Sequence, residues 1–403
     1  MLSGRTIHLC VCGGVAAYKA VEAVRLLQKA GAQVQVALTA NAQAFVGPMT
    51  FQALTHAPVL TRTLDAAEEM AIGHIAFAQR CDALLVAPCT ANMLAKIAHG
   101  LGDDLVSTVL LAAPVGTLPV LIAPAMNTVM WDNPATQANL RVLRERGYTV
   151  LTPDAGALAC GAVGPGRLPE PEALVAAVIE ALAPRPLTGR RVLITAGPTR
   201  EPIDPARFLS NASTGKAGFA VALAAARAGA EVTVVHGPVS IPAPPGVHAV
   251  PVTTAIEMHR EVMARWSDAD AVVMSAAVAD YRPAEVHGQK VKKLDGPMTL
   301  TLVRNPDILA EVGHARTGPH PVLVGFAAET GHPVAYARDK LVRKRCDLIV
   351  ANDVTAPGAG FGTETNQVWF VTDDGEVALP LQAKATVGER IVDFIVSRLV
   401  AAR

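Results

Sequence analysis

Short apolar runs, each followed by a turn and a helical pattern, recur along the chain and predict its secondary structure. Residues 7–12 (IHLCVC) form a mostly apolar run, and a helical pattern over 16–32 follows the pair Gly13-Gly14. In the next run, 33–39 (QVQVALT), apolar residues occupy every second position, which is typical of a strand. We expect the helix to end at Gly31, and the three elements together predict a βαβ unit.

The same order of elements recurs in the second half of the chain. We expect a strand over 190–197, a helix over 215–230 and a strand over 231–237. Further apolar runs follow in each half, and their continuous character favours parallel strands that are covered on both faces. These runs are 82–88, 119–124, 148–153, 270–276, 321–327 and 346–352.

These elements predict two doubly wound, mostly parallel-sheet α/β domains (Rossmann/flavodoxin-like) in tandem. Pro184 and Pro186 indicate a linker between them, so we expect domains 1–188 and 189–403. The second domain should close with a hairpin over 366–382 that turns at Asp374-Gly375, and with a helix over 384–403.

Composition narrows the functional classes. The chain has 403 residues, of which 51% are hydrophobic, and its 35 basic and 35 acidic residues leave no net charge, which argues against nucleic acid and membrane surfaces as partners. Six scattered cysteines without metal-ligand spacing favour a reducing, cytoplasmic location. The uncharged stretch 105–131 could span a bilayer by length, but its three prolines favour a buried helix, a loop and a strand.

Ligands of open parallel sheets bind beyond the carboxyl ends of the strands, so polar residues after the apolar runs are the candidate site. Gly13-Gly14 opens the first helix and favours a phosphate, although tight packing explains a glycine pair equally well. The second strand ends in Thr39 rather than an acidic residue, and GxGxxG is absent, which favours a mononucleotide over NAD.

Three further features of the first half are candidates for chemistry. Thr90 and Asn127 follow predicted strands and present a hydroxyl and an amide, with helix N-capping as the alternative. His74 lies on a helical segment and has a structural role as its alternative. Cys160 lies in a glycine-rich stretch, 158–168, which resembles neither a helix nor a strand.

In the second half, a long connection over 197–218 replaces a short βα turn, and such an excursion is usually functional. Asn211 and nearby hydroxyls would lie at a helix start, whereas Lys216 resembles a P-loop lysine only superficially. Asp280 is a candidate Mg²⁺ ligand. Lys290 and its neighbours Lys292 and Lys293 could cover a polyphosphate, with a solvated surface as the alternative. The same alternative applies to the helical pair Lys340 and Lys344, four residues apart.

Taken in order, the motifs GGVAAYK, GHIAF, APCTANMLAKIAHGLGDDL, PAMNTVMWDNPA and GALACGAVGPGRLPE resemble those of the phosphopantothenoylcysteine decarboxylases. The resemblance implies that His74 and Asn127 lie near the substrate carboxylate and that Cys160 is a proton donor on a substrate-covering loop. It implies an FMN site formed by Gly13, Gly14, Thr39, Pro88, Thr90, Asn92 and Met126. One departure is Cys12, where relatives often carry a hydroxyl residue.

Residues 189–400 resemble the CTP-using bacterial phosphopantothenate–cysteine ligases. The resemblance implies that 4′-phosphopantothenate and CTP form an acyl-cytidylate, that cysteine displaces CMP, and that Asn211 and Lys290 are catalytic. It implies contacts to CTP from Met274, Ser275, Ala276, Asp280, Lys290, Pro306, Asp307, Ile308, Leu309, Phe326, Lys340 and Lys344.

Together the halves predict a bifunctional enzyme of coenzyme A biosynthesis that uses FMN, Mg²⁺ and CTP on small-molecule substrates. The resemblance also implies a homo-oligomer with a trimer-based decarboxylase and a dimeric ligase, up to a dodecamer. Alternatives for the first half are a flavoprotein decarboxylase of peptidyl cysteine, a flavin prenyltransferase and a non-catalytic flavin-binding module, and a nicotinamide oxidoreductase remains a rival for the whole.

Overall fold

The computed structural model describes residues 2–63, 73–157, 163–292 and 298–401. The chain forms two compact units, Met1–Ala183 (unit 1) and Pro184–Arg403 (unit 2). Among the described residues, no helix combines the length and the apolar character needed to cross a bilayer. The uncharged stretch 105–131 forms a helix, a loop and a strand, as expected.

Unit 1 is built on a six-stranded parallel sheet in the order β3-β2-β1-β4-β5-β6, with a separate antiparallel pair, β7-β8. Its strands are β1 Thr6–Val11, β2 Gln33–Leu38, β3 Val59–Leu60, β4 Ala83–Cys89, β5 Val120–Pro124, β6 Thr149–Val150, β7 Asp154–Ala157 and β8 Val163–Arg167. Its helices are α1 Ala17–Lys29, η1 Ala42–Ala44, α2 Pro48–Thr55, α4 His74–Gln79, α5 Ala91–His99, α6 Leu105–Ala112, α7 Thr128–Asp132, α8 Pro134–Glu145 and α9 Pro171–Ala181.

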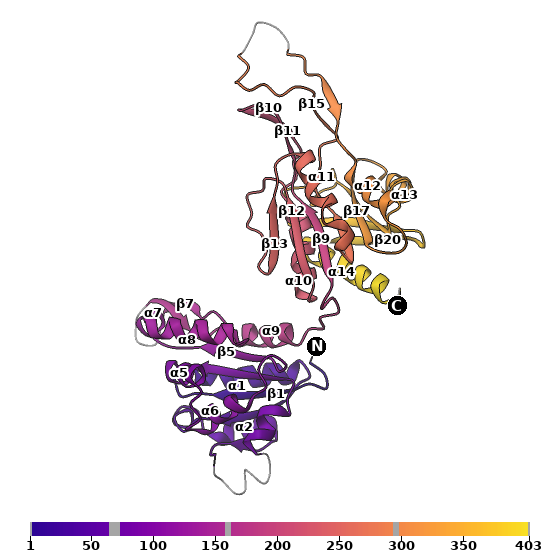
Figure 1. The fold of residues 1–403 in the computed structure, drawn as a ribbon. Coiled ribbons are helices and arrows are strands. Elements are labelled where there is room, and N and C mark those ends of the chain that lie inside the picture. The colour runs from indigo at the N-terminus through magenta and orange to yellow at the C-terminus, as the bar shows by residue number, and fades with distance from the viewer. Residues whose placement is uncertain (1, 64–72, 158–162, 293–297, 402–403) are drawn as a thin grey trace. The chain divides into compact units, whose positions relative to one another are not determined.

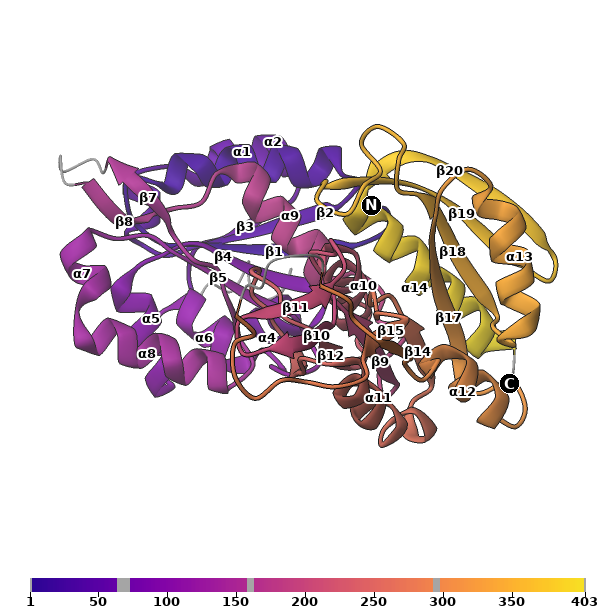
Figure 2. The same cartoon turned by 90° about the horizontal axis from the view of Figure 1, so that it is seen from above.

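Helices cover both faces of this sheet, because its strands are apolar on both sides. Ile7 and Leu9 of β1 pack into a core with α1, α2 and α9, whereas Cys10 faces a second core with α4, α5, α6 and α8. Figure 2 shows the sheet between α1 and α2 on one side and α5, α6 and α8 on the other. Burial of both faces provides the hydrophobic stabilisation of this unit.

Unit 2 repeats the arrangement with an eight-stranded sheet, β13-β12-β9-β14-β17-β18-β19-β20, and two antiparallel pairs, β10-β11 and β15-β16. Its strands are β9 Arg191–Ala196, β10 Arg200–Asp204, β11 Arg207–Ser210, β12 Glu231–His236, β13 Val247–Pro251, β14 Ala271–Met274, β15 Tyr281–Pro283, β16 Leu302–Arg304, β17 Val322–Glu329, β18 Leu348–Asp353, β19 Thr365–Thr372 and β20 Gly375–Ala383. Its helices are α10 Lys216–Arg227, α11 Ala255–Met263, η2 Trp266–Asp268, α12 Ile308–Ala315, α13 Pro333–Arg343 and α14 Lys384–Ala401.

Two helical layers also enclose the sheet of unit 2. Phe219 of α10 and Ile391 of α14 belong to one core, and Met258 of α11, Val312 of α12 and Leu341 of α13 belong to the other. Figure 2 shows α14 and α13 on opposite sides of the sheet. The predicted fold class, two doubly wound and mostly parallel-sheet domains, is therefore confirmed.

The long connection predicted after β9 is present, and two other local predictions need correction. The long connection after β9 contains the hairpin β10-β11, which together with β15 extends beyond the sheet of unit 2 (Figure 1). The final hairpin turns at Asp373-Asp374, because Gly375 already pairs with Thr372 as the first residue of β20. Part of the glycine-rich stretch 158–168, which was expected to be neither helix nor strand, forms strand β8, which pairs with β7; Cys160 itself lies outside the described residues.

Candidate active sites

The carboxyl edge of the sheet in unit 1 gathers most of the residues predicted for the flavin site. Gly13-Gly14 follow β1, Thr39 follows β2, Thr90 follows β4 and Met126 lies just beyond β5. All four strands are parallel, so these residues lie along one edge. The strand order reverses between β1 and β4, which is where doubly wound sheets open a crevice for a ligand.

The two glycines after β1 differ in their surroundings. A Cβ added at Gly13 would lie 2.5 Å from the Cβ of Asn41, so Gly13 is required for tight packing. A Cβ added at Gly14 would meet nothing within 4 Å. The packing alternative therefore holds for Gly13, whereas Gly14 borders open space at the start of the 13-residue helix α1. Cys12, the departure from the family pattern, is buried in the core with Cys10 and Cys89.

Three polar residues of this edge make hydrogen bonds with the following backbone. The Thr39 hydroxyl oxygen accepts from the Ala42 amide at 3.2 Å. Thr90 accepts from Met93 at 3.3 Å and caps α5, and the Asn127 side-chain oxygen accepts from Val129 at 2.8 Å and caps α7. The capping alternatives for Thr90 and Asn127 are therefore real, but a threonine that accepts a bond still has a hydroxyl proton to donate.

Strand β8 lies directly against the loop that follows β5. The Met126 amide donates to the carbonyl of Gly166 at 2.9 Å. Gly166 has φ +125°, and a Cβ added there would overlap the Met126 carbonyl oxygen. A Cβ at Gly164 would lie 2.8 Å from the Thr128 hydroxyl. The strand that follows residues 158–162 is therefore fitted closely onto the segment that carries Met126 and Asn127.

The other predicted residues of unit 1 that the structure describes are Pro88, Asn92 and His74. Pro88 is buried in β4 and accepts from the Cys12 amide at 3.1 Å, across the switch between β1 and β4. Asn92 is exposed in the first turn of α5. His74 is the first residue of α4, which is a separate element from the strands that carry the edge residues.

In unit 2, hydrogen bonds fix the backbone that follows β14 against the end of β9. The Ser275 hydroxyl donates to the Thr195 carbonyl at 2.7 Å, and the Ala276 amide donates to the Thr195 hydroxyl at 3.1 Å. The side-chain amide of Asn211 donates to the Ala277 carbonyl at 2.9 Å. The structure therefore places Asn211, from the long connection, beside the predicted nucleotide segment 274–276.

A second group of predicted residues meets where α12 and α13 approach the end of β17. The Lys344 ammonium lies 2.8 Å from a carboxylate oxygen of Asp307, and the Lys340 ammonium donates to the Phe326 carbonyl at 2.9 Å. Burial, and the charge of Lys344, lower the pKa of Lys340. Partial burial alone would raise the pKa of Asp307, but the hydrogen bond and charge of Lys344 outweigh it and lower that pKa.

The other predicted residues of this group are the neighbours of Asp307 in the sequence. Asp307 accepts from the Ala310 amide at 3.1 Å and caps α12, so Pro306 precedes the helix and Ile308 and Leu309 form its buried first turn. Lys340 lies in α13 and Lys344 directly follows that helix; their ammonium groups contact the Phe326 carbonyl and the Asp307 cap of α12. The solvated-surface alternative is therefore wrong for this pair.

Asp280 is joined to the segment that precedes Asp307, whereas Lys290 lies outside that group of residues. Asp280 is exposed, and its carbonyl accepts from the Asn305 amide at 2.8 Å. Lys290 is exposed in the segment between β15 and β16. Among the described residues, no hydrogen bond joins this segment to the pair Asp307–Lys344, and no three His, Cys, Asp or Glu side chains gather as a metal site.

Among the buried ionic side chains that sequence reasoning missed are Asp204, Lys19 and Lys384. Asp204 is bound within the β10-β11 turn, and the buried Lys19 of α1 lies 3.0 Å from Glu170 and donates to the Leu168 carbonyl at 3.1 Å. The Lys384 ammonium donates to the carbonyls of Gly360, Phe361 and Thr363 at 3.2, 3.3 and 2.5 Å. The Asp-Pro pair at 204–205 was a recognisable turn signal, whereas the two lysines carry no local signal.

The loop around Lys384 also contacts the start of α10. The Lys216 ammonium lies 2.5 Å from Glu364 and donates to the Gly362 carbonyl at 3.0 Å, and the Thr214 hydroxyl donates to the Phe361 carbonyl at 2.9 Å. We call residues 359–365 the carbonyl loop. The Lys216 ammonium binds this loop. This contact agrees with the expectation that Lys216 resembles a P-loop lysine only superficially.

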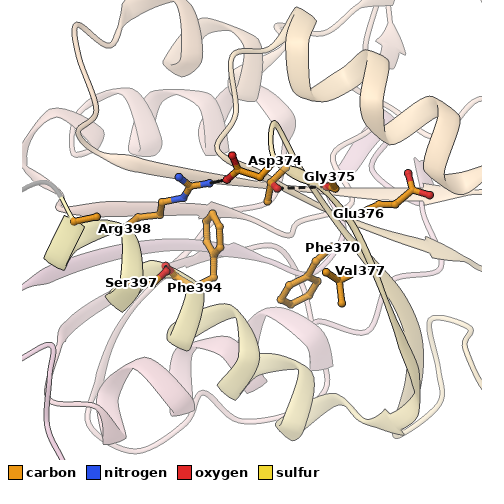
Figure 3. A pocket seen from close by; sticks show the side chains of 10 residues that line it. Phe370, Asp374, Gly375, Glu376, Val377, Phe394, Ser397 and Arg398 are labelled. Atoms are coloured by element: carbon orange, nitrogen blue, oxygen red, sulfur yellow. Dashed lines mark hydrogen bonds and ion pairs between the residues drawn. The ribbon is translucent and has the colours of Figure 1, made fainter.

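A surface pocket of about 590 Å³ lies elsewhere in unit 2, between the β19-β20 hairpin and the end of α14. In Figure 3 its apolar wall consists of Phe370, Val377 and Phe394, and an ion pair joins Arg398 to Asp374 at 3.1 Å. None of the predicted site residues lines it. The chemistry therefore has to be sought at the carboxyl edges rather than in this pocket.

The fold and the two carboxyl-edge sites define a tandem α/β protein with a flavoprotein-type first half. The family described as "Flavoprotein" matches residues 1–183, and the family described as "DNA/pantothenate metabolism flavoprotein C-terminal domain" matches residues 187–399. Two relatives, both named "Coenzyme A biosynthesis bifunctional protein CoaBC", come from Vibrio vulnificus (47% identity over 98% of both chains) and Bacillus subtilis (48% identity over 98% of this chain and 97% of the relative).

Among solved structures, the C-terminal domain of a coenzyme A biosynthesis bifunctional protein CoaBC is similar, with 39% identity and a TM-score of 0.47 over 54% of this chain and 99% of that chain. The protein belongs to the family of bifunctional coenzyme A biosynthesis proteins CoaBC. The expectation of a bifunctional enzyme with a decarboxylase and a ligase activity is thereby confirmed.

Proposed function

We propose that residues 189–403 join cysteine to 4′-phosphopantothenate at the expense of CTP, and that residues 1–188 decarboxylate the product to 4′-phosphopantetheine with FMN. The observation that carries this proposal is the position of the predicted residues. In unit 1, Gly13-Gly14, Thr39, Thr90 and Met126 follow four parallel strands at one carboxyl edge, on either side of the point where the strand order reverses. In unit 2, Ser275 and Ala276 follow β14 and are bound to Thr195 of β9, the two strands between which the strand order reverses.

The edge of unit 1 fits FMN in two respects. Gly14 leaves open space at the start of α1, where backbone N–H groups and the helix dipole suit a phosphate. Hydroxyl and amide groups after the other strands suit the polar rim of a flavin ring. The proposed contacts are Gly13, Gly14, Thr39, Pro88, Thr90, Asn92 and Met126. Bound FMN would supply a reversible two-electron oxidation of the sulfur-bearing carbon, which makes loss of the neighbouring carboxylate possible.

The protein's own residues would then hold the substrate and manage its protons. Asn127 would orient the departing carboxylate through its amide, and His74 would orient the substrate or act as a base. Cys160 would donate the proton that completes the product. Support for this placement comes from β8, which follows residues 158–162 and lies against the segment of Met126 and Asn127.

The ligase reaction has two steps. A carboxylate oxygen of 4′-phosphopantothenate attacks the α-phosphorus of CTP, so that an O–P bond forms, the bond to the β-phosphate breaks and pyrophosphate leaves. The amine of cysteine then attacks the acyl carbon, CMP leaves with the bonding electron pair and the amine loses a proton.

Negative charge develops on the phosphates in the first step, which is why positioned cations matter. Lys290 would bind the triphosphate, and Lys340 and Lys344 lie close to the other proposed nucleotide contacts, Asp307 and Phe326. Asn211 would act on the acyl-cytidylate from its place beside Ala277. Asp280 is the proposed Mg²⁺ contact, and its exposed carboxylate is accessible to a nucleotide-bound ion.

We further propose a homo-oligomer with a trimer-based decarboxylase and a dimeric ligase, symmetries that a dodecamer satisfies together. Exposed apolar side chains support contacts between copies in both units. They include Val15, Tyr18, Phe45 and Met49 in unit 1, and Phe208, Tyr281 and Leu302 in unit 2. Cytoplasmic location is proposed from the five described cysteines, all of which are free thiols.

The test combines the purified protein with 4′-phosphopantothenate, cysteine, Mg²⁺ and either CTP or ATP. We expect CMP release followed by CO₂ evolution, with CTP favoured over ATP. Lys290→Gln should lower CMP formation by about 100-fold while decarboxylation of supplied 4′-phosphopantothenoylcysteine continues. Cys160→Ser should retain a yellow protein and normal CMP formation, but should lower 4′-phosphopantetheine formation by about 10²–10⁴-fold.

A colourless protein that cannot take up FMN would contradict the proposal for unit 1. Equal loss of both activities in either variant would contradict the assignment of one activity to each unit. Full 4′-phosphopantetheine formation by Cys160→Ser would remove the proton-donor role.

A further inference from the structure

One buried carboxylate in unit 2 has more hydrogen bonds than its own turn requires. The side chain of Asp204 is 0% exposed and lies at the tip of the β10-β11 hairpin. One of its oxygens accepts from the amides of Ala206 and Arg207 at 2.8 and 2.9 Å, which closes the turn. The other accepts from the Arg207 guanidinium at 2.6 and 3.0 Å. These contacts are sufficient to close and stabilise the hairpin.

The same pair also binds a distant segment of the chain. The second carboxylate oxygen of Asp204 accepts from the Val291 amide at 3.2 Å, and the Arg207 guanidinium donates to the Val291 carbonyl at 3.0 Å. Both polar backbone atoms of Val291 are therefore bound by one ion pair. Four residues earlier, the His287 amide donates to the Ile203 carbonyl at 3.0 Å, so this segment is attached to β10 at two points.

Lys290 is the residue between these attachments and next to Val291. Its side chain is exposed, and the segment 284–292 around it is almost entirely exposed. Its backbone position is therefore determined by the hairpin and not by burial in a core. A carboxylate that is bound by a guanidinium and three backbone amides gives a well-defined attachment point, because each bond to the charged group is stronger than a bond between neutral groups.

We propose that Asp204, together with Arg207, is a positioning residue for Lys290 and sets where its ammonium meets the phosphates of the nucleotide. This inference rests on the proposed role of Lys290. Asp204 does not touch the substrate in this role. It acts by holding Val291, and a displacement of about 1 Å in a catalytic cation is enough to cost about 100-fold in rate.

A double-mutant cycle in the full-length protein tests the proposal. The variants are Asp204→Asn, Lys290→Gln and the double variant, and the measurement is pyrophosphate release with 4′-phosphopantothenate and CTP. We expect Asp204→Asn to lower kcat by about 10- to 100-fold with little change in the KM for CTP, because the contacts at Asp307, Lys340 and Lys344 remain. In the Lys290→Gln background the same change should have almost no further effect.

Three further measurements distinguish an effect on the position of Lys290 from a loss of folding. Glu285→Gln alters an exposed carboxyl group of the same segment and should leave pyrophosphate release unchanged. Hydrogen exchange should rise at 287–292 in Asp204→Asn but stay as in the wild type in β14 and β17. Decarboxylation of supplied 4′-phosphopantothenoylcysteine by unit 1 should be unaffected.

The outcomes are distinguishable. If Lys290→Gln itself leaves pyrophosphate release intact, the proposed role of Lys290 fails. If Lys290→Gln is slow and Asp204→Asn slows it further by its full separate factor, Asp204 does not act through Lys290 and the inference is overturned. Should Asp204→Asn not fold, Asp204→Glu replaces it in the cycle, because it keeps the negative charge and displaces the carboxylate from the Val291 amide. The same absence of a further effect is then expected.

Discussion

The two units have the same order of parallel strands and differ in the segments that connect these strands. When the strands of each sheet are numbered in chain order, the sheet of unit 1 has the order 3-2-1-4-5-6. The parallel strands β13-β12-β9-β14-β17-β18 of unit 2 have the same order. In unit 1 the first strand leads to α1 through a short turn at Gly13-Gly14, whereas in unit 2 the hairpin β10-β11 intervenes between β9 and α10. Unit 2 also adds β15-β16 after its fourth strand and two antiparallel strands at one edge.

We infer that specificity in such proteins is encoded in the inserted segments. The sheets supply the same edge and the same reversal of strand order, but the inserted segments decide which side chains reach that edge. A short turn in unit 1 leaves the start of α1 open. The longer insertions of unit 2 bring Asn211 beside Ala277 and attach the Lys290 segment to a hairpin.

The largest effect is expected from a substitution that disturbs the carboxyl edge of unit 1 and leaves that of unit 2 unchanged. In Gly166→Ala the new methyl group would overlap the Met126 carbonyl oxygen, at a backbone φ of +125° that favours glycine. We expect formation of 4′-phosphopantetheine to fall by about 10- to 100-fold, because β8 can no longer lie on the segment of Asn127. CMP formation by unit 2 should stay at the wild-type rate, measured in the same sample.

Gly47→Ala is the matched control, because nothing lies within 4 Å of the added Cβ and the backbone φ there is −69°. It should leave both activities unchanged. Wild-type decarboxylation by Gly166→Ala would mean that β8 does not position the site of unit 1.

A second prediction concerns the carbonyl loop, which has no counterpart in unit 1. Lys384→Met removes the ammonium that binds the carbonyls of Gly360, Phe361 and Thr363 and leaves these groups without their partner. We expect unit 2 to lose about 2–4 kcal/mol of unfolding free energy while unit 1 keeps its stability. Urea unfolding followed by fluorescence reports on unit 2 through Trp266 and Trp369, and on unit 1 through Trp131.

Arg390→Met serves as the control, since Arg390 is an exposed cation on the same helix, α14. Its effect should be below about 0.5 kcal/mol. If Lys384→Met is no more destabilising than Arg390→Met, the ammonium is not what holds the carbonyl loop.

The smallest effect is expected from a buried histidine of unit 1. His8 is 2% exposed, stacks on Phe77 and shares a hydrogen bond of 2.5 Å with the Phe77 carbonyl. Burial lowers the pKa of His8 and outweighs the opposing effect of that hydrogen bond. Below a pH of about 6.5 the unfolded chain therefore binds a proton that the folded unit does not, so stability falls as the solution becomes more acidic.

The measurement is the Tm of unit 1 between neutral and mildly acidic pH, in wild type and in His8→Gln. The wild type should lose about 1–4 °C more than the variant over this range. The exposed His99, changed to Gln, should leave the pH dependence as in the wild type. A pH dependence that is the same in all three proteins would show that His8 does not contribute to it.

The sequence allowed the sheets to be predicted but not the inserted strands. Runs such as 82–88 and 321–327 are continuously apolar because both of their faces are buried, and this pattern is visible without a structure. Strand β8 reads Val-Gly-Pro-Gly-Arg, a composition that disfavours strands, and it forms because its glycines permit close contact with the loop after β5. Strand β10 contains a proline, and a two-residue turn at an Asp-Pro pair joins it to β11.

The residues of the candidate sites likewise include some that the sequence predicts and some whose contacts it does not predict. Residues at or just after the end of a predicted strand, such as Thr39, Thr90 and Ser275, were identifiable because the strand itself was. Asp204 and Lys384 could not be assigned their contacts from the sequence. Their partners lie 87 residues later for Asp204, at Val291, and 21 to 24 residues earlier for Lys384. No periodic pattern reports on contacts of this kind.

The ammonium of Lys384 takes the place that a potassium ion often occupies in proteins, at the centre of a group of backbone carbonyl oxygens. Here the cation is covalently part of the chain. It cannot be removed by dialysis or exchanged for sodium, so the order of residues 359–365 should be independent of which monovalent salt surrounds the enzyme.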